Sequence, residues 1–432
     1  MSLAPPSSPE TVFTYGAPQL KFGSGASAEL GVDLATLEVS RVLLVTDGGL
    51  MSTGHPQRLA EQIRGHGIDV VLFDGVRIEP TDASLQAAVE FAREAGPVDG
   101  LVAVGGGSSI DTAKAVNLLL TNPGELLEYV NRPIGGGRAP EHRLHPLVAV
   151  PTTTGTGSES TTICVLDVLA RRVKTGISHA RLRPTLAVVD PDLTATQPPA
   201  VTAASGMDVM CHALESYTAR SFDSYERHAA QRRVPYCGAN PLSDQWAEKA
   251  LSLLARAYRR AVTDGADRQA RSDMALAATV AGLGFGNAGV HIPHANAYPI
   301  AGQVRSFRAP GYPGEEPFVP HGMAVGLTAP AALRFTFPAD PARHVRAAEL
   351  LDPDDRADAR AGAPEDRLPR VLAGLMADVG LPDGLAAVGF TEADIPELVS
   401  GAQAQTRLLE TAPRPVHGDD LAAILIASLE NR

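Results

Sequence analysis

Before Asp190 the chain alternates short apolar runs with stretches of helical periodicity. Apolar strands separated by helices are typical of a parallel sheet covered on both faces, so the pattern predicts an α/β fold. The capping residues Thr81 and Asp82 mark the start of one of the helices. The expected strands are Arg41–Thr46, Asp69–Phe73, Gly100–Val104, His145–Val150 and Leu186–Val189, and the expected helices include His55–His66 and Ala83–Glu94.

The pattern changes near Asp190–Pro199, a turn-rich stretch that contains three prolines. Beyond it, most segments carry the 3.6-residue periodicity of helices. We therefore predict an α/β domain over residues 1–195 and an α-helical domain over residues 196–432, with a loose tail at Met1–Pro9 and an exposed loop at Asp352–Glu365. The expected helices are Gly206–Ala219, Ser243–Thr263, Arg268–Leu283, Ala324–Phe335, His344–Leu351, Leu368–Val379 and Asp419–Glu430.

Composition narrows the class of protein. The 432 residues include 37 Lys and Arg against 49 Asp and Glu, which gives a net charge of −12. An acidic chain without a basic run argues against nucleic-acid binding, and no apolar stretch reaches the roughly 20 residues of a membrane span. The three cysteines form no pairing pattern, which favours a reducing compartment. Because the N-terminus lacks a signal or transit pattern, we expect a cytoplasmic protein.

Two loops that follow strands are candidates for binding a dinucleotide. Gly105, Gly106 and Gly107 precede Ser108 and Asp111 at the start of a helix, where exposed amides suit a pyrophosphate. A second loop after the next strand contains Thr152, Thr153 and Thr156. Each alone also suits a plain turn or surface loop, but ligands of open α/β sheets bind at the carboxyl ends of strands. Together the loops predict a nucleotide site.

A third glycine-rich segment is not expected to bind a dinucleotide. Gly284–Gly289 spells G-x-G-x-x-G, but it follows a helical pattern, whereas a dinucleotide fingerprint should follow a strand. We interpret this segment as a break between helices.

Candidate metal ligands lie in the helical half. Asp208 and His212 are four positions apart in an expected helix, so both side chains project from one face. The same spacing also suits an ordinary surface pair. Three further histidines, His291, His294 and His321, lie near Gly or Pro. One Asp with three His would form a mixed oxygen and nitrogen ligand set that suits Fe(II) or Zn(II) and leaves room for a substrate oxygen.

These motifs, in this order, resemble the iron-containing alcohol dehydrogenases. The resemblance rests on GGGSxxD, PTTTGTGSE, GxDxxxHxxE from Gly206 to Glu215, and a late PHG, and it spans nearly the whole chain. It implies NAD as cofactor and one divalent metal, Fe²⁺ or alternatively Zn²⁺. It also implies that Lys174 contacts the cofactor and that Asp47 selects NAD. The implied metal ligands are Asp208, His212, His294 and His321.

A branch of that family, the hydroxyacid-oxoacid transhydrogenases, is more similar still. This resemblance rests on Arg233–Asp244, Gly284–His291 and Gly384–Gly389. It implies hydride transfer from 4-hydroxybutyrate to 2-oxoglutarate through a retained nicotinamide cofactor. The family commonly has His-Gly-Met after the third ligand and a further His beside the nicotinamide, where this chain has Ala295-Asn296 and Tyr298.

Tyr298 is therefore the candidate catalytic residue, although it also suits a packed tyrosine. Arg305 and Arg308 are candidate counter-charges for an acid substrate, although both also suit the surface. The expected partner is a small alcohol or hydroxyacid, without nucleic acid or membrane, and a homodimer is the assembly to consider. The alternatives are a dehydroquinate-synthase-like lyase that uses NAD and a metal, and a nucleotide-binding protein without turnover.

Overall fold

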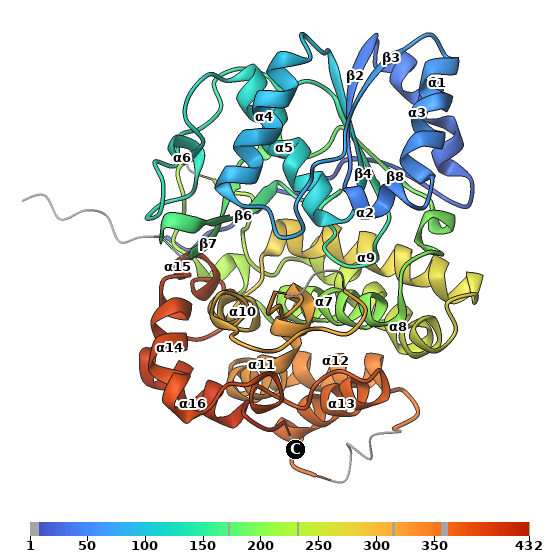
Figure 1. The fold of residues 1–432 in the computed structure, drawn as a ribbon. Helices are drawn as coiled ribbons and strands as arrows, with labels where there is room; N and C mark the ends of the chain where they lie inside the picture. Colours follow the sequence, from blue (N-terminus) through green and yellow to red (C-terminus); the bar gives the residue numbers. More distant parts are fainter. Residues whose placement is uncertain (1–7, 172, 231–232, 313–315, 356–361, 432) are drawn as a thin grey trace, which may run out of the picture.

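The computed structural model describes residues 8–171, 173–230, 233–312, 316–355 and 362–431. It has an N-terminal α/β domain, in the upper part of Figure 1, and a C-terminal helical domain below it. Most of the expected tail, residues 1–7, lies outside the described residues. So does the centre of the expected loop at Asp352–Glu365, residues 356–361.

The α/β domain is built on a six-stranded parallel sheet in the order β1-β8-β5-β4-β2-β3. The five strands expected from the sequence are present, and β1 is an additional edge strand. A separate antiparallel hairpin, β6 with β7, was also not expected. The strands are β1 (Gln19–Phe22), β2 (Arg41–Val45), β3 (Asp69–Phe73), β4 (Gly100–Gly105), β5 (Leu147–Pro151), β6 (Ile163–Val168), β7 (Val173–Ser178) and β8 (Leu186–Val189).

Helices cover both faces of this sheet (Figure 1). Successive strand residues point to opposite faces: Leu43 of β2 packs with the side of α4 and α5, and Leu44 with that of α1 and α3. Thr81 caps α4 as expected, because its hydroxyl accepts the Ser84 amide at 3.0 Å. The helices of this domain are α1 (Leu30–Thr36), α2 (Gly48–Met51), α3 (His55–Gly65), α4 (Asp82–Glu94), α5 (Gly107–Thr121) and α6 (Leu126–Tyr129).

The helical domain surrounds a single large apolar core. All seven expected helices are present, and α7 begins earlier than expected, at Pro199. Gly284 and Gly286 lie inside α9, so the G-x-G-x-x-G segment does end a helix. The helices are α7 (Pro199–Thr218), α8 (Pro241–Thr263), α9 (Arg268–Ala288), α10 (Ile292–Gln303), α11 (His321–Thr336), α12 (Pro341–Leu351), α13 (Pro364–Asp378), α14 (Ile395–Gln403), α15 (Thr406–Leu409) and α16 (Gly418–Ala427).

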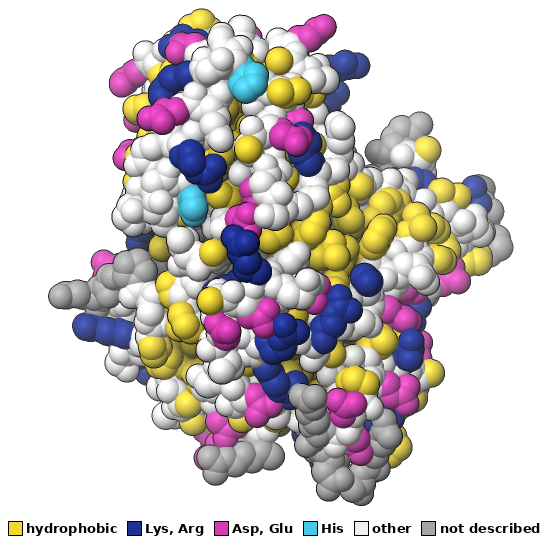
Figure 2. Space-filling model, turned by 90° about the vertical axis from the view of Figure 1, so that its right-hand side faces the viewer, with side chains coloured by type: hydrophobic (Ala, Val, Ile, Leu, Met, Phe, Trp, Pro, Cys, Tyr) yellow, Lys and Arg dark blue, Asp and Glu magenta, His cyan; other side chains and the backbone are white. Residues whose placement is uncertain are grey.

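The surface carries charges of both signs. Figure 2 shows one face, where hydrophobic side chains gather midway between the upper and lower parts and charged side chains occupy much of the remainder. Within the described ranges, no single helix is long and apolar enough to cross a membrane. The pair α9 and α10 passes such a test only when taken together, and the two helices meet at 104°.

Candidate metal and cofactor site

The four predicted metal ligands converge on one point. Asp208 and His212 come from α7, His294 from the first turn of α10, and His321 is the first residue of α11. The Nε2 atoms of His212, His294 and His321 lie 3.7, 3.5 and 4.0 Å from Asp208 Oδ1. In the trio Asp208, His294 and His321, one ligand atom of each residue lies within 4.8 Å of the others. The sequence analysis grouped these residues, and the structure brings them together.

Their unpaired atoms test whether a cation fits. Asp208 Oδ1 and His294 Nε2 are buried and have no hydrogen-bond partner among the described residues. Burial would raise the pKa of Asp208, but the three imidazoles around it lower it instead. Burial also lowers the pKa of His212 to about 3. A charged carboxylate and neutral imidazole are the forms that bind metal, so these residues fit a divalent ion.

Glu215 sets the orientation of His294, a role that the sequence analysis did not assign. Its Oε1 lies 2.6 Å from His294 Nδ1, and its Oε2 accepts the His291 amide at 2.7 Å. Burial alone would lower the pKa of His294, but Glu215 and Asp208 raise it to about 9, so binding of a metal would release a proton from this ring. A carboxylate on one ring nitrogen fixes the other toward a metal. The sequence spacing could have indicated this role, because Glu215 lies seven positions after Asp208 and so shares its helix face.

The start of α11 approaches α7 closely, and this approach places His321. A Cβ at Gly322 would lie 2.2 Å from the Ala204 carbonyl oxygen and 2.6 Å from Asp208 Cβ. Only glycine permits this contact, which explains the PHG motif. By contrast, His291 lies away from the cluster, because its Nε2 is 3.1 Å from the Thr218 hydroxyl.

The predicted cofactor loops lie side by side. They follow β2, β4 and β5, which are neighbours in the sheet, so Asp47 and the two glycine and threonine loops share one edge. A Cβ at Gly107 would lie 2.6 Å from Thr156 Oγ1, and one at Gly106 would lie 3.2 Å from Thr153 Oγ1. The Thr152 amide donates to the Gly105 carbonyl at 3.0 Å. The helix α5 begins without a side-chain cap, so its first amides point at this edge unpaired by the helix itself.

Asp47 and Ser108 face this edge in different ways. One Asp47 oxygen caps α2 by accepting the Leu50 amide at 2.9 Å, while the other lies 3.5 Å from the Cβ position of Gly105. The Ser108 hydroxyl accepts the Glu79 amide at 3.2 Å. The second oxygen of Asp47 therefore lies close to the glycine loop.

Asp111 is held by protein partners instead. It accepts hydrogen bonds from the Ser158 hydroxyl and, at 2.9 Å, from the Val165 amide. Lys114, which is fully buried, lies 3.5 Å from Asp111 and donates to the carbonyls of Ser158 and Ile163 at 2.8 and 2.7 Å. These contacts join the start of α5 to the threonine loop and to β6. Asp111 supports the cofactor loops through these bonds, and the sequence analysis missed Lys114, three positions later.

Lys174 lies on β7 and forms an ion pair with Glu79, with Asp167 at 3.6 Å. Burial would lower the pKa of Lys174, but these two carboxylates raise it. Tyr298 lies nearby on α10, with its ring centre 6.0 Å from that of His321. Burial raises the pKa of Tyr298 to about 12, so its hydroxyl keeps its proton.

A cavity of about 110 Å³ joins the two halves of the site. Gly107, Ser108 and Thr156 line one side, and the metal ligands and Tyr298 line the other. A larger cavity of about 750 Å³ lies beside it and shares Glu79 and Tyr298.

The arginines around this cavity differ from those that were expected. Arg305 is 66% exposed and pairs with Asp394 at 2.5 Å, and Arg308 is exposed. Neither lines the metal cavity, whereas Arg407 does. The sequence analysis missed Arg407 because it lies more than 80 positions beyond the third and fourth ligands.

Known proteins resemble the chain over almost its full length. A protein named hydroxyacid-oxoacid transhydrogenase, mitochondrial, from Bos taurus is 43% identical over 421 residues, covering 97% of this chain and 90% of that protein. The crystal structure of 1,3-propanediol oxidoreductase has a TM-score of 0.82 at 31% identity, covering 97% and 100% of the two chains. Sulfoacetaldehyde reductase from Bifidobacterium kashiwanohense, in complex with NAD⁺, has a TM-score of 0.78 at 26% identity, covering 96% and 98%.

The prediction of a cytoplasmic location is wrong by this comparison, since relatives at this level of identity are named as mitochondrial proteins. The cysteine argument failed for a physical reason. The three free thiols suit any reducing compartment and do not distinguish one from another.

Two family domains account for most of the chain. Residues 17–191 match the domain described as iron-containing alcohol dehydrogenase, and residues 202–429 match the C-terminal domain of the Fe-containing alcohol dehydrogenase family. The match favours an enzyme over a nucleotide-binding protein without turnover, and a dehydrogenase over a lyase. The chain therefore belongs to the iron-containing alcohol dehydrogenase family, and it is an oxidoreductase.

Proposed function

We propose that the protein is a hydroxyacid-oxoacid transhydrogenase with a retained NAD. It oxidises a small hydroxyacid such as 4-hydroxybutyrate and reduces a 2-oxoacid such as 2-oxoglutarate. The observation that carries the proposal is a single cavity lined by both the Asp208–His cluster and the cofactor loops. The names of the relatives at 43% identity over 97% of the chain supply the substrate classes.

The reaction consists of two balanced halves. In the first, the hydroxyl group of 4-hydroxybutyrate loses its proton and the neighbouring C–H passes a hydride to NAD⁺, which leaves the aldehyde. In the second, the keto carbon of 2-oxoglutarate would take up that hydride from the reduced cofactor and its oxygen a proton, which gives 2-hydroxyglutarate. No outside oxidant is needed, because one acid is oxidised as the other is reduced.

Different residues of the chain would hold the metal and the cofactor. Asp208, His212, His294 and His321 would hold the divalent ion, for which we propose Fe²⁺ with Zn²⁺ as the alternative. Such an ion acts as a Lewis acid that lowers the pKa of a substrate hydroxyl. We propose that the loops at Gly105–Ser108 and Thr152–Thr156, with Asp47 and Lys174, hold the NAD, and that Asp111 supports them. This division keeps the proposed boundary near residue 195, with cofactor groups before it and metal ligands after it.

Tyr298 is proposed to hold a proton beside the reacting oxygen. Its hydroxyl stays protonated because burial raises its pKa to about 12. A phenol O–H can donate a hydrogen bond to the substrate oxygen or to the carboxylate of an acid. Nearby, Lys174 is neutralised by Glu79, so this pair adds no net charge to the cavity wall.

The test is turnover without added cofactor. The metal-loaded protein is mixed with 4-hydroxybutyrate and 2-oxoglutarate in the absence of NAD, and 2-hydroxyglutarate is measured. We expect product and parallel lines in double-reciprocal plots, as ping-pong kinetics require. Strict dependence on added NAD or NADH, with no stimulation by 2-oxoglutarate, would show a plain dehydrogenase instead.

A further inference from the structure

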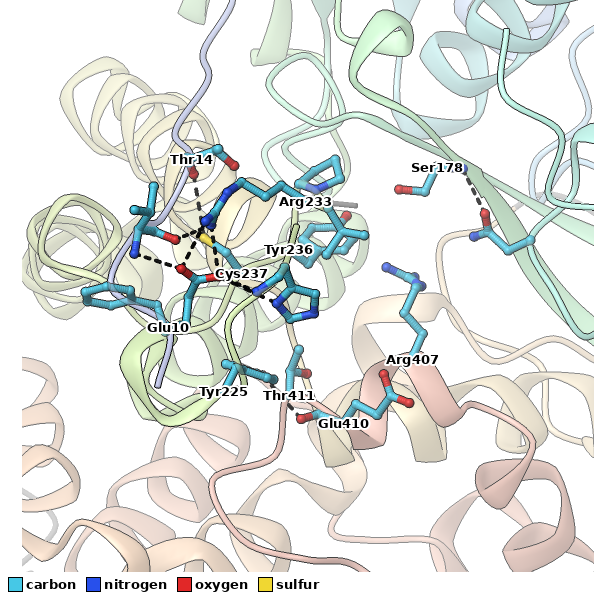
Figure 3. A pocket seen from close by; sticks show the side chains of 16 residues that line it. Glu10, Thr14, Ser178, Tyr225, Arg233, Tyr236, Cys237, Arg407, Glu410 and Thr411 are labelled. Atoms are coloured by element: carbon cyan, nitrogen blue, oxygen red, sulfur yellow. Dashed lines mark hydrogen bonds and ion pairs between the residues drawn. The ribbon is translucent and has the colours of Figure 1, made fainter. Parts of the chain in front are cut away.

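Arg407 is a cation that contacts Tyr236 but forms no ion pair with a carboxylate among the described residues. Its side chain points from α15 into the space near Tyr236 and Ser178 (Figure 3), and its guanidinium carbon lies 4.9 Å from the centre of the Tyr236 ring. Its Nη1 is buried without a hydrogen-bond acceptor among the described residues. A buried donor left unpaired costs free energy, more so on a charged group, so this position favours an anionic ligand.

The position of Arg407 connects it to the reaction. Arg407 and Tyr236 line the cavity of about 310 Å³ drawn in Figure 3, and both also line the metal cavity of about 110 Å³. The guanidinium therefore lies at the wall between the two spaces, within reach of a molecule bound beside the metal ligands.

The other charged side chains around the metal cavity already face groups of the protein. Glu79 pairs with Lys174, and Asp111 lies beside Lys114. Asp208 faces three imidazoles. Arg407 is the one Lys or Arg among the described residues that line this cavity, and it forms no ion pair with any of them. A substrate carboxylate entering here meets one unpaired cation.

We propose that Arg407, held against the Tyr236 ring, binds the carboxylate of both substrates and so selects acids over uncharged alcohols. This inference rests on the proposed transhydrogenase function. A guanidinium fork matches a carboxylate with two parallel hydrogen bonds, and the face of Tyr236 limits how the fork can turn.

The chemistry of the two acids explains how one arginine can serve both. In 4-hydroxybutyrate, three carbon–carbon bonds separate the carbon that loses hydride from the carboxylate carbon. In 2-oxoglutarate, three carbon–carbon bonds likewise separate the keto carbon from the distal carboxylate carbon. A cation at one fixed distance from the metal ligands therefore places either reacting carbon at the same point. Donor and acceptor can then use a single site in turn, as ping-pong exchange requires.

The test compares each substrate with a molecule of matched length that has a methyl group in place of the carboxylate Arg407 is proposed to bind. The donors are 4-hydroxybutyrate and butan-1-ol, and the acceptors are 2-oxoglutarate and 2-oxopentanoate, which has a methyl group in place of the distal carboxylate. For Arg407→Met we expect kcat/KM to fall about 10²- to 10³-fold for 4-hydroxybutyrate and 2-oxoglutarate, as for loss of one partner of a buried charge pair. The values for butan-1-ol and 2-oxopentanoate should change less than about threefold. Arg407→Lys keeps the charge but not the fork, so we expect a loss of about tenfold.

A matched control and a second measurement guard against misfolding. Arg414 also stacks on an aromatic ring, with its guanidinium carbon 4.4 Å from the Phe335 centre, but it is exposed and lines none of the cavities described above. Arg414→Met should leave all four substrates unaffected. Succinate cannot be reduced, so its competitive inhibition of butan-1-ol oxidation reports carboxylate binding directly. Its inhibition constant should rise by about the same factor in Arg407→Met, and Arg407→Lys supplies the comparison if the Met variant does not fold.

The outcomes separate the two proposals. If the wild type uses hydroxyacids and Arg407→Met retains its preference for acids, Arg407 does not bind the carboxylate, while the transhydrogenase function stands. If the wild type oxidises butan-1-ol but not 4-hydroxybutyrate, the proposed function fails, and the role of Arg407 fails with it.

Discussion

The two sides of the central cavity are built on opposite principles. On the cofactor side, the charged groups are satisfied within the protein: Asp111, Lys114 and Ser158 bond to one another and to nearby backbone. On the metal side, Asp208 Oδ1 and His294 Nε2 are buried with no hydrogen-bond partner among the described residues. The buried charges of the cofactor side are therefore paired within the protein, whereas the metal side holds ligand atoms that a cation would satisfy.

Because of this difference, substitutions on the two sides should affect different properties, the free energy of unfolding on one side and metal binding and activity on the other. A substitution in the bonded network of the cofactor side breaks existing interactions, so the folded state should lose free energy. A substitution among the predicted ligands removes atoms whose metal-facing side has no protein partner, so the main loss should be metal and activity, with a smaller loss of stability where a ligand also bonds Glu215.

The largest effect is expected at His294. His294→Ala should lower metal affinity more than about 100-fold, beyond what loss of an outer-shell group causes, and activity should fall with it. Metal content after dialysis and circular dichroism measure the two effects. The matched control is His291→Gln, three positions earlier and also buried, which should keep its metal because His291 faces Thr218. Full metal occupancy in His294→Ala would contradict the four-ligand assignment.

The opposite result is expected at Lys114, which is fully buried. Lys114→Met leaves Asp111 buried without its cation and leaves the Ser158 and Ile163 carbonyls short of a donor. The free energy of unfolding should fall by about 3–5 kcal/mol, as for other broken buried pairs, while metal binding by the folded protein persists. Denaturant unfolding of the metal-loaded protein measures this loss. Lys249, which is exposed on α8, is the control, because Lys249→Met should stay within about 0.5 kcal/mol. Equal stability of the two variants would show that the network is not needed.

The contrast also explains which parts could be predicted from the sequence. The strands β2, β3, β4, β5 and β8 were predicted because a buried parallel strand is a continuous apolar run. The edge strand β1 was missed because Gln19–Phe22 is largely exposed and only half apolar. The helix α10 was missed because it is buried on nearly every side and contains Pro299, so it shows no amphipathic stripe.

Site residues, too, could be predicted only where their own sequence pattern or composition is distinctive. Asp208 and His212 were visible as a helix pair, and the glycine and threonine loops as unusual composition. Glu215 and Lys114 act through other side chains, and Arg407 comes from a four-residue helix far along the chain. Spacing in a sequence does not reveal a contact made only by the tertiary fold, so these three roles needed the structure.

A smaller effect is expected on the cofactor side at Asp47. The oxygen beside Gly105 is placed to accept the ribose 2′-OH and would repel a 2′-phosphate. Asp47→Gly should shift the ratio of kcat/KM for NAD over NADP toward NADP by about tenfold, the value of one hydrogen bond to a charged group. Glycine is tolerated as a helix N-cap, so α2 should remain folded. Dehydrogenase assays of protein freed of its bound cofactor, with NAD or NADP added, measure the ratio, and an unchanged ratio would remove Asp47 from this role.

The smallest effect is expected at Tyr298. A packing role and a hydrogen-bonding role for this side chain predict different results. Its pKa is raised to about 12 by burial, with Arg407 and Lys174 opposing the rise. Because a raised pKa keeps the neutral form below that pH, Tyr298 should produce no step in the activity profile between about pH 6 and 10. Tyr298→Phe removes only the hydroxyl, so kcat should fall about three- to tenfold, the value of one neutral hydrogen bond, while metal content and unfolding stay near wild type. Tyr312, whose pKa is also raised by burial, lies outside the metal cavity, and Tyr312→Phe is the control. If both variants match the wild type in kcat, Tyr298 is a packing residue, and the metal side alone performs the chemistry.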